Sequence, residues 1–125
     1  MLLEPTNKNL NTLFVNIDKV LIRDTSYLTK DFVPKVMASI DDDLEIKNLQ
    51  KLLAIDESVS INPCMCHGDY QIDLYSTNEL KATISFHHGE SIRFEGWTND
   101  ATLVFGKELL ELIKIAKKKF KIKIK

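Results

Sequence analysis

The chain has few of the residues that separate or cross-link domains. Its 125 residues include only four glycines, three prolines and two cysteines. This is too little glycine and proline for a low-complexity linker. We therefore expect one domain over residues 1–125, with a basic C-terminal tail over about 117–125.

Long apolar runs and the features of a secretory leader are also missing. No stretch reaches the roughly 18 apolar residues of a membrane helix. The start of the chain carries an acidic residue at position 4 and has no cleavage site of small residues. We therefore expect a cytoplasmic protein without a membrane role. In the cytoplasm Cys64 and Cys66 are expected to be thiols, and a disulfide across so short a spacing would be strained.

Acidic and basic residues are divided unevenly along the chain. Residues 107–125 contain eight lysines and two glutamates, whereas the preceding residues contain nine lysines or arginines and sixteen acidic residues. An acidic body repels nucleic acid and anionic membranes, so we expect a protein partner and neither of these. The tail is interpreted as a solvated helix end, favoured by the helix dipole, followed by a frayed or edge-strand terminus.

Hydrophobic periodicity predicts the fold class. Alternating apolar and polar residues predict three strands at about 70–75, 80–87 and 92–95. One-sided apolar stripes predict helices from Asp42 or Asp43 to about Asp56 and over 106–120. We therefore expect an α+β domain in which an antiparallel sheet, a meander of at least three strands, is packed by two amphipathic helices.

The N-terminal part is ambiguous. Apolar residues over 10–24 fit both a helical stripe and one or two strands with a turn at Asp18–Lys19, and the β-branched content favours strands. Pro34 favours extended backbone before it, so a loop and a short strand are expected over 25–39.

Both cysteines and all three histidines lie between positions 64 and 88. In the predicted meander, a three-residue loop places Ile72 opposite residue 82 or 84 and Cys66 opposite residue 88 or 90. Cys64, Cys66 and His88 then share the apolar face of the sheet, while His67 and His87 point to the other face.

Three functions fit this set of residues. Two thiolates and one imidazole suit zinc, so Cys64, Cys66 and His88 form a candidate metal site with zinc as the candidate cofactor. The alternatives are a packed core without metal and a thiol nucleophile activated by His88. No oxyanion-hole motif, phosphate-binding loop or flanking carboxylate pair accompanies them, so we expect binding rather than catalysis.

A second candidate site lies in the segment SIRFEGWTNDA. Arg93 and the only tryptophan, Trp97, have the composition of a binding hot spot, and His87 on the polar face of the sheet is included with them as a candidate binding residue. The alternative for Trp97 is that it closes one end of the core.

The ordered motifs CMCHGD, FHHG and RFEGW resemble those of short bacterial proteins of unknown function. These carry C-x-C-x-G-D, then H-H-G, then R-(W/F)-x-x-W before a C-terminal helix, and the match covers about residues 64–113. Here Phe86 and Phe94 stand where leucine and tryptophan are usual, which preserves apolar packing. The resemblance implies no catalytic residue.

The function expected from the sequence is therefore non-catalytic protein–protein interaction in a small cytoplasmic bacterial domain. Its size and acidity are similar to those of immunity proteins, which bind toxins. The alternative is a small zinc-binding protein. The pattern leaves the partner and the oligomeric state open.

Overall fold

The structure is a computed structural model that describes residues 2–25, 34–59 and 68–123. The elements follow one another as α1 (Asn7–Leu13), β1 (Lys19–Asp24), β2 (Lys35–Ile40), α2 (Asp43–Leu52), β3 (Tyr70–Ser76), β4 (Glu79–His87), β5 (Ser91–Arg93), β6 (Ala101–Thr102) and α3 (Gly106–Lys123). In the described part of the chain, no helix combines the length and apolar character needed to cross a membrane.

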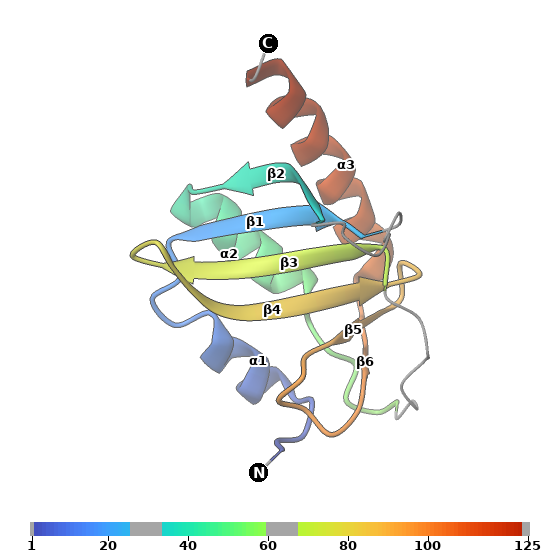
Figure 1. Ribbon diagram of the computed structural model, residues 1–125. Helices are drawn as coiled ribbons and strands as arrows, with labels where there is room; N and C mark the ends of the chain where they lie inside the picture. The colour runs from blue at the N-terminus through green and yellow to red at the C-terminus, as the bar shows by residue number, and fades with distance from the viewer. Residues whose placement is uncertain (1, 26–33, 60–67, 124–125) are drawn as a thin grey trace.

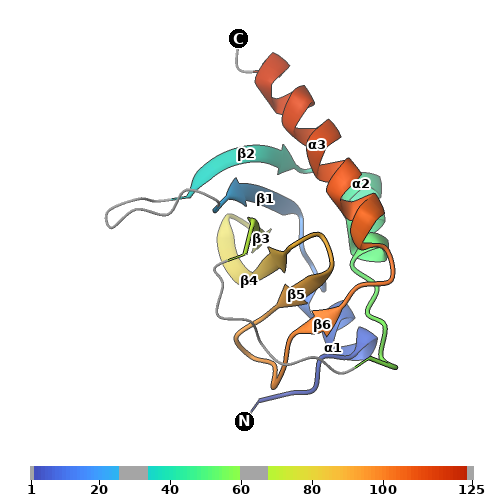
Figure 2. The ribbon, with the colours of Figure 1, turned by 90° about the vertical axis from the view of Figure 1, so that its right-hand side faces the viewer.

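The strands form one six-stranded antiparallel sheet in the order β2-β1-β3-β4-β5-β6. Helices α2 and α3 lie side by side against one face of this sheet (Figures 1 and 2). The expected α+β class, the antiparallel meander and the two packing helices are confirmed. The meander continues from β3 to β6, and the sheet also includes the earlier strands β1 and β2.

Helix α2 begins where local chemistry favours a helix start. The Asp42 side chain accepts a hydrogen bond from the Glu45 backbone N at 3.1 Å and so caps α2. Acidic residues in the first turn of α2 oppose the positive end of its dipole. Helix α3 continues to Lys123, so most of the predicted basic tail is helical, and this end of α3 extends past β2 (Figures 1 and 2).

The β3–β4 register matches one of the two predicted arrangements, because Ile72 pairs with Ile84. The connection is a two-residue turn rather than the expected three-residue loop. Thr77 and Asn78 have φ values of 51° and 66°, the left-handed geometry of a tight hairpin. A register shift between Leu74 and Tyr75 compensates for the shorter turn.

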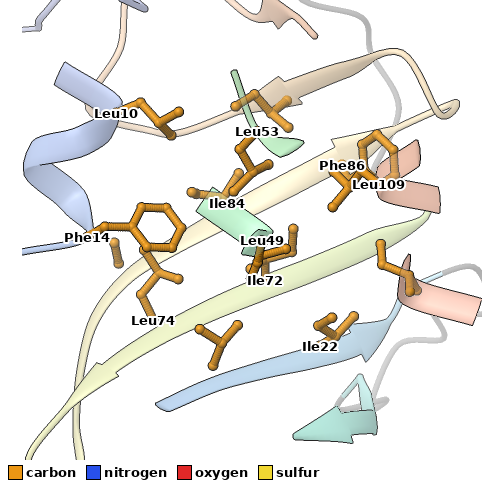
Figure 3. Packing of buried hydrophobic residues seen from close by; sticks show 14 of the residues in the cluster. Leu10, Phe14, Ile22, Leu49, Leu53, Ile72, Leu74, Ile84, Phe86 and Leu109 are labelled. Carbon is orange, nitrogen blue, oxygen red and sulfur yellow. The ribbon is translucent and has the colours of Figure 1, made fainter. Parts of the chain in front are cut away.

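The core lies between the helices and the sheet. Its strand residues come from the alternating positions that the sequence predicts, and α1, α2 and α3 cover them (Figure 3). The largest fully buried apolar side chains are Phe86, Leu10, Ile22, Leu49, Leu53, Ile72, Leu74, Ile84, Ile92, Leu109 and Ile113.

The preference for strands over residues 10–24 is wrong for the first half of that segment. Thr6 caps a short helix, since its hydroxyl accepts from the Asn9 backbone N at 3.2 Å. Leu10 and Phe14 then fall on one side of the helix and enter the core. The second half is β1, and the short strand expected near Pro34 is β2.

Candidate functional site

The predicted metal set can be followed only through His88, because Cys64 and Cys66, like His67, lie outside the described residues. His88 is exposed in the turn after β4 and has a φ of 55°. Its backbone N donates to Asp69 Oδ2 at 3.0 Å. The described residues contain no group of three His, Cys, Asp or Glu side chains arranged to hold a metal. The zinc site stays a prediction.

His87 requires a correction. Strand parity places it on the face of the sheet opposite the helices, as expected, but the side chain is 0% exposed and not solvated. Burial lowers the pKa of the imidazole, and the nearby positive charge of Arg93 lowers it further. A Cβ on Gly68 would lie 3.2 Å from His87 Cε1 and Nε2, so Gly68 packs directly against the ring. His87 is therefore no surface-binding residue in this structure.

Arg93 and Trp97 have separate structural roles. Arg93 Nε and Nη2 donate to the two carboxylate oxygens of buried Asp100 at 2.8 and 3.0 Å. Trp97 is only 5% exposed and contacts Phe94 edge-on, with ring centroids 5.6 Å apart. It also forms a bridge with Leu3 near the N-terminus. The alternative interpretation, in which Trp97 closes the core, is the one that the structure supports.

The strand ends around His87 are held together by hydrogen bonds. Asp69 N donates to Phe86 O at 2.9 Å, and Thr25 N donates to Asp69 O at 3.1 Å. Thr25 Oγ1 donates to Gly68 O at 2.9 Å. We call this region, residues 68–69 and 86–89 with Arg93 and Asp100, the sheet end. The backbone groups named here and the side chains of Asp69, Arg93 and Asp100 are engaged in hydrogen bonds within the fold, which indicates a structural role.

The face of the sheet opposite the helices carries a second buried carboxylate. Asp73 accepts hydrogen bonds from Arg23 Nε at 3.0 Å, from Gln71 Nε2 at 3.0 Å and from Thr83 Oγ1 at 2.9 Å. Arg23 also donates to the carbonyl of Pro34 at 3.0 Å. This network ties β1, β3 and β4 together and offsets the cost of burying the charge.

An open apolar groove lies elsewhere, between α2 and α3. A groove of about 480 Å³ is lined by Ile40, Glu45, Asn48, Leu52, Glu108, Glu111, Leu112, Ile115, Ala116 and Lys119. We call it the interhelix groove. Its apolar part comes from the end of β2 and from both helices. Ile115 is 55% exposed there, beside half-buried Leu112 and Ala116.

The edge of the interhelix groove is acidic. Glu45 on α2 and Glu108 and Glu111 on α3 are all exposed, against one lysine, Lys119. The ion pair between Lys114 Nζ and Glu111 Oε1 is long, at 3.7 Å, and exposed, so it holds Glu111 only weakly. The groove therefore combines an apolar floor with a negative rim.

The interhelix groove was not predicted from the sequence. The apolar stripe of the helix predicted over 106–120 includes Leu112 and Ala116 but not Ile115. The available signal was that Leu112, Ile115 and Lys119 are spaced three and four residues apart, which defines a second face of the helix.

A scan against protein-family models, a search of curated proteins and a search of solved structures find no match to this chain. The resemblance over residues 64–113 stays a prediction.

Proposed function

We propose that this protein is a non-catalytic binding domain whose interhelix groove holds a segment of a protein. The segment has an apolar stripe and basic flanks. The observation that carries the proposal is the combination of exposed Ile115 with the three glutamates of the rim. We place this function in the cytoplasm.

Helix-in-groove binding fits the chemistry of the site. An amphipathic helix buries its apolar face in such grooves, with anchors three or four residues apart. Burial of Ile115, Leu112 and Leu52 by the partner would supply the affinity. Lysines or arginines beside the apolar anchors would pair with Glu45, Glu108 and Glu111, which favours a basic partner over an acidic one.

The environment of the buried polar residues supports a binding role over a catalytic one. Asp73 and Asp100, the buried carboxylates among the described residues, are each paired with an arginine. His87 is buried beneath Gly68. Groups engaged in this way stabilise the fold and are not presented to a substrate. The immunity-type role, in which the partner is a toxin, stays a prediction.

Site-specific photo-crosslinking tests the proposal. A benzophenone amino acid at position 115, in the protein expressed in its native host, is expected to give a discrete protein adduct. Glu111→Lys in the same chain should remove that adduct, because it reverses one charge of the rim. The same crosslinker at position 80 is the control, since Leu80 is exposed on β4, away from the groove.

Equal adducts from positions 115 and 80, or an adduct from position 115 that is insensitive to Glu111→Lys, would contradict a specific groove. Absence of any adduct from position 115 would contradict protein binding there.

A further inference from the structure

We propose that the occupant of the interhelix groove is a second copy of this chain, bound through an antiparallel pairing of the two α3 helices centred on Ile115. This inference rests on the proposed function, because it names the partner for the same groove. It makes the domain a symmetric dimer in which each chain both supplies and fills a groove.

The charge pattern of α3 carries the inference. The first part of the helix places Glu108 and Glu111 at the groove, whereas Lys117, Lys118 and Lys119 follow in the second part. Two such helices attract each other when antiparallel and repel each other when parallel. The helix therefore matches the basic amphipathic segment that the groove requires.

Residue spacing fixes the register of the pairing. Glu111 precedes Ile115 by four positions, and Lys119 follows it by four. In an antiparallel pair centred on Ile115, Glu111 of each copy faces Lys119 of the other, and both positions line the groove. The two-fold symmetry produces this pair twice.

The apolar centre of the contact is already exposed. Ile115 of each copy would meet its counterpart on the symmetry axis, between half-buried Leu112 and Ala116. An exposed isoleucine flanked by apolar residues and then by charges is the arrangement of an interface with an apolar core and a charged rim.

The shape of the monomer allows this approach. Helix α3 runs along the outside of the sheet beside α2, and its C-terminal half extends past β2 (Figures 1 and 2). The uneven charge of the chain points to the same partner, since its lysines are concentrated in residues 107–125 and the rest is acidic. Each copy thus carries both the acidic rim and the basic helix.

Sedimentation velocity of the full chain over a series of protein concentrations tests the inference. We expect a monomer–dimer equilibrium that weakens as salt is added. Ile115→Glu should abolish the dimer, because it places two carboxylates on the symmetry axis. Circular dichroism should show that the variant remains folded, since Ile115 is outside the buried core.

Charge reversal defines the register. Glu111→Lys and Lys119→Glu, made singly, should each raise the dissociation constant at least about tenfold, since each introduces two like-charge contacts. The double variant should restore the wild-type constant to within about threefold. Lys47→Glu, the same change on an exposed α2 residue outside the interhelix groove, is the matched control and should leave the constant unchanged.

A chain that remains monomeric at every concentration overturns the inference, as does a double variant that fails to regain dimerisation. The crosslinking experiment then separates a failure of this inference from a failure of the proposed function. A crosslink from position 115 to a different protein would support the groove and reject the second copy. A crosslinked species of twice the mass of the chain, lost when Glu111→Lys is added to the chain that carries the crosslinker, supports both.

Discussion

The sheet end and the interhelix groove differ in how many of their side chains already have partners within the fold. The sheet end contains a buried histidine and an ion pair between partly buried Arg93 and buried Asp100, but Asp69, Arg93 and Asp100 have partners within the fold. The groove contains ordinary leucine, isoleucine and glutamate, and Ile115 among them is left in solvent. A prediction from residue type alone therefore selects the sheet end, which is less available to a ligand than the interhelix groove.

The largest expected effect tests whether the sheet end is structural. Asp100→Ala leaves the partly buried Arg93 without its carboxylate, and we expect the free energy of unfolding to fall by about 3 kcal/mol. Urea denaturation followed by circular dichroism measures this change. A loss smaller than that caused by Ile115→Ser would contradict a structural role for the pair.

Gly68→Ala is expected to have the next largest effect. Gly68 has a φ of 85°, and an added Cβ would press on the His87 ring and on the Phe86 carbonyl, each 3.2 Å away. We expect a loss of about 2 kcal/mol in unfolding free energy, from left-handed strain and from crowding. Unfolding midpoints in urea provide the measurement. An unchanged midpoint would show that the ring is not packed as described.

The same packing gives the sheet end a pH dependence. The pKa of His87 is lowered in the folded state from the ordinary histidine pKa of 6.5. At a pH below 6.5, the unfolded chain therefore binds more protons than the folded chain. Stability is therefore fully present above that pH and falls as the pH drops below it, by at most about 1.4 kcal/mol per pH unit.

His87→Gln should reduce this slope, measured by urea denaturation between neutral pH and about pH 5, above the ordinary range of carboxylate titration. His88→Asn serves as the control, since His88 is exposed in the adjacent turn. A slope that persists in His87→Gln and disappears in His88→Asn would reverse the assignment of the two histidines.

Small changes in the groove should leave stability almost unaffected. We expect Ile115→Ser to alter the unfolding free energy by no more than about 0.5 kcal/mol, because the side chain is mostly in solvent. Differential scanning calorimetry at low protein concentration keeps dimer formation from contributing. A large destabilisation would mean that Ile115 belongs to the core and not to a binding surface.

The smallest expected effect concerns metal. Under the proposed function, the thermal unfolding midpoint should not change with EDTA, and metal analysis of untagged protein should find less than a stoichiometric amount of zinc. A midpoint that falls with EDTA in the wild type, and not in a Cys64→Ser, Cys66→Ser variant, would instead support the predicted zinc site.

Much of the fold follows from short-range pattern. Alternation in Ile72–Leu74 and Ile84–Phe86 identified both strands and their inner faces, because the helices of the described part of the chain cover one side of the sheet. The capping aspartate identified the start of α2. The first helix was missed because the β-branched residues of this segment favoured strands over the helical stripe that includes Leu10 and Phe14, and Thr6 was not recognised as its cap.

The candidate site was harder to predict for a physical reason. Strand parity gives the side of the sheet on which His87 lies, but not what covers that side. The exposure of Ile115 depends on how far apart α2 and α3 lie, which is set by the packing of residues distant in sequence, such as Leu49 and Ile113. The local periodicity of the sequence indicates neither what covers His87 nor the distance between α2 and α3.

One backbone contact joins the two regions. Gly106 begins α3, and any Cβ there would collide with the carbonyl oxygen of Gly89 in the turn after His88. The turn at His88 and Gly89, which includes a residue of the predicted zinc site, therefore contacts the start of the helix that forms one wall of the groove. Helix α3 extends roughly 27 Å from this contact. A small tilt of the helix at Gly106 would therefore move its far end the most. We expect substitutions at Gly89 to change the width of the groove, although Gly89 does not line it.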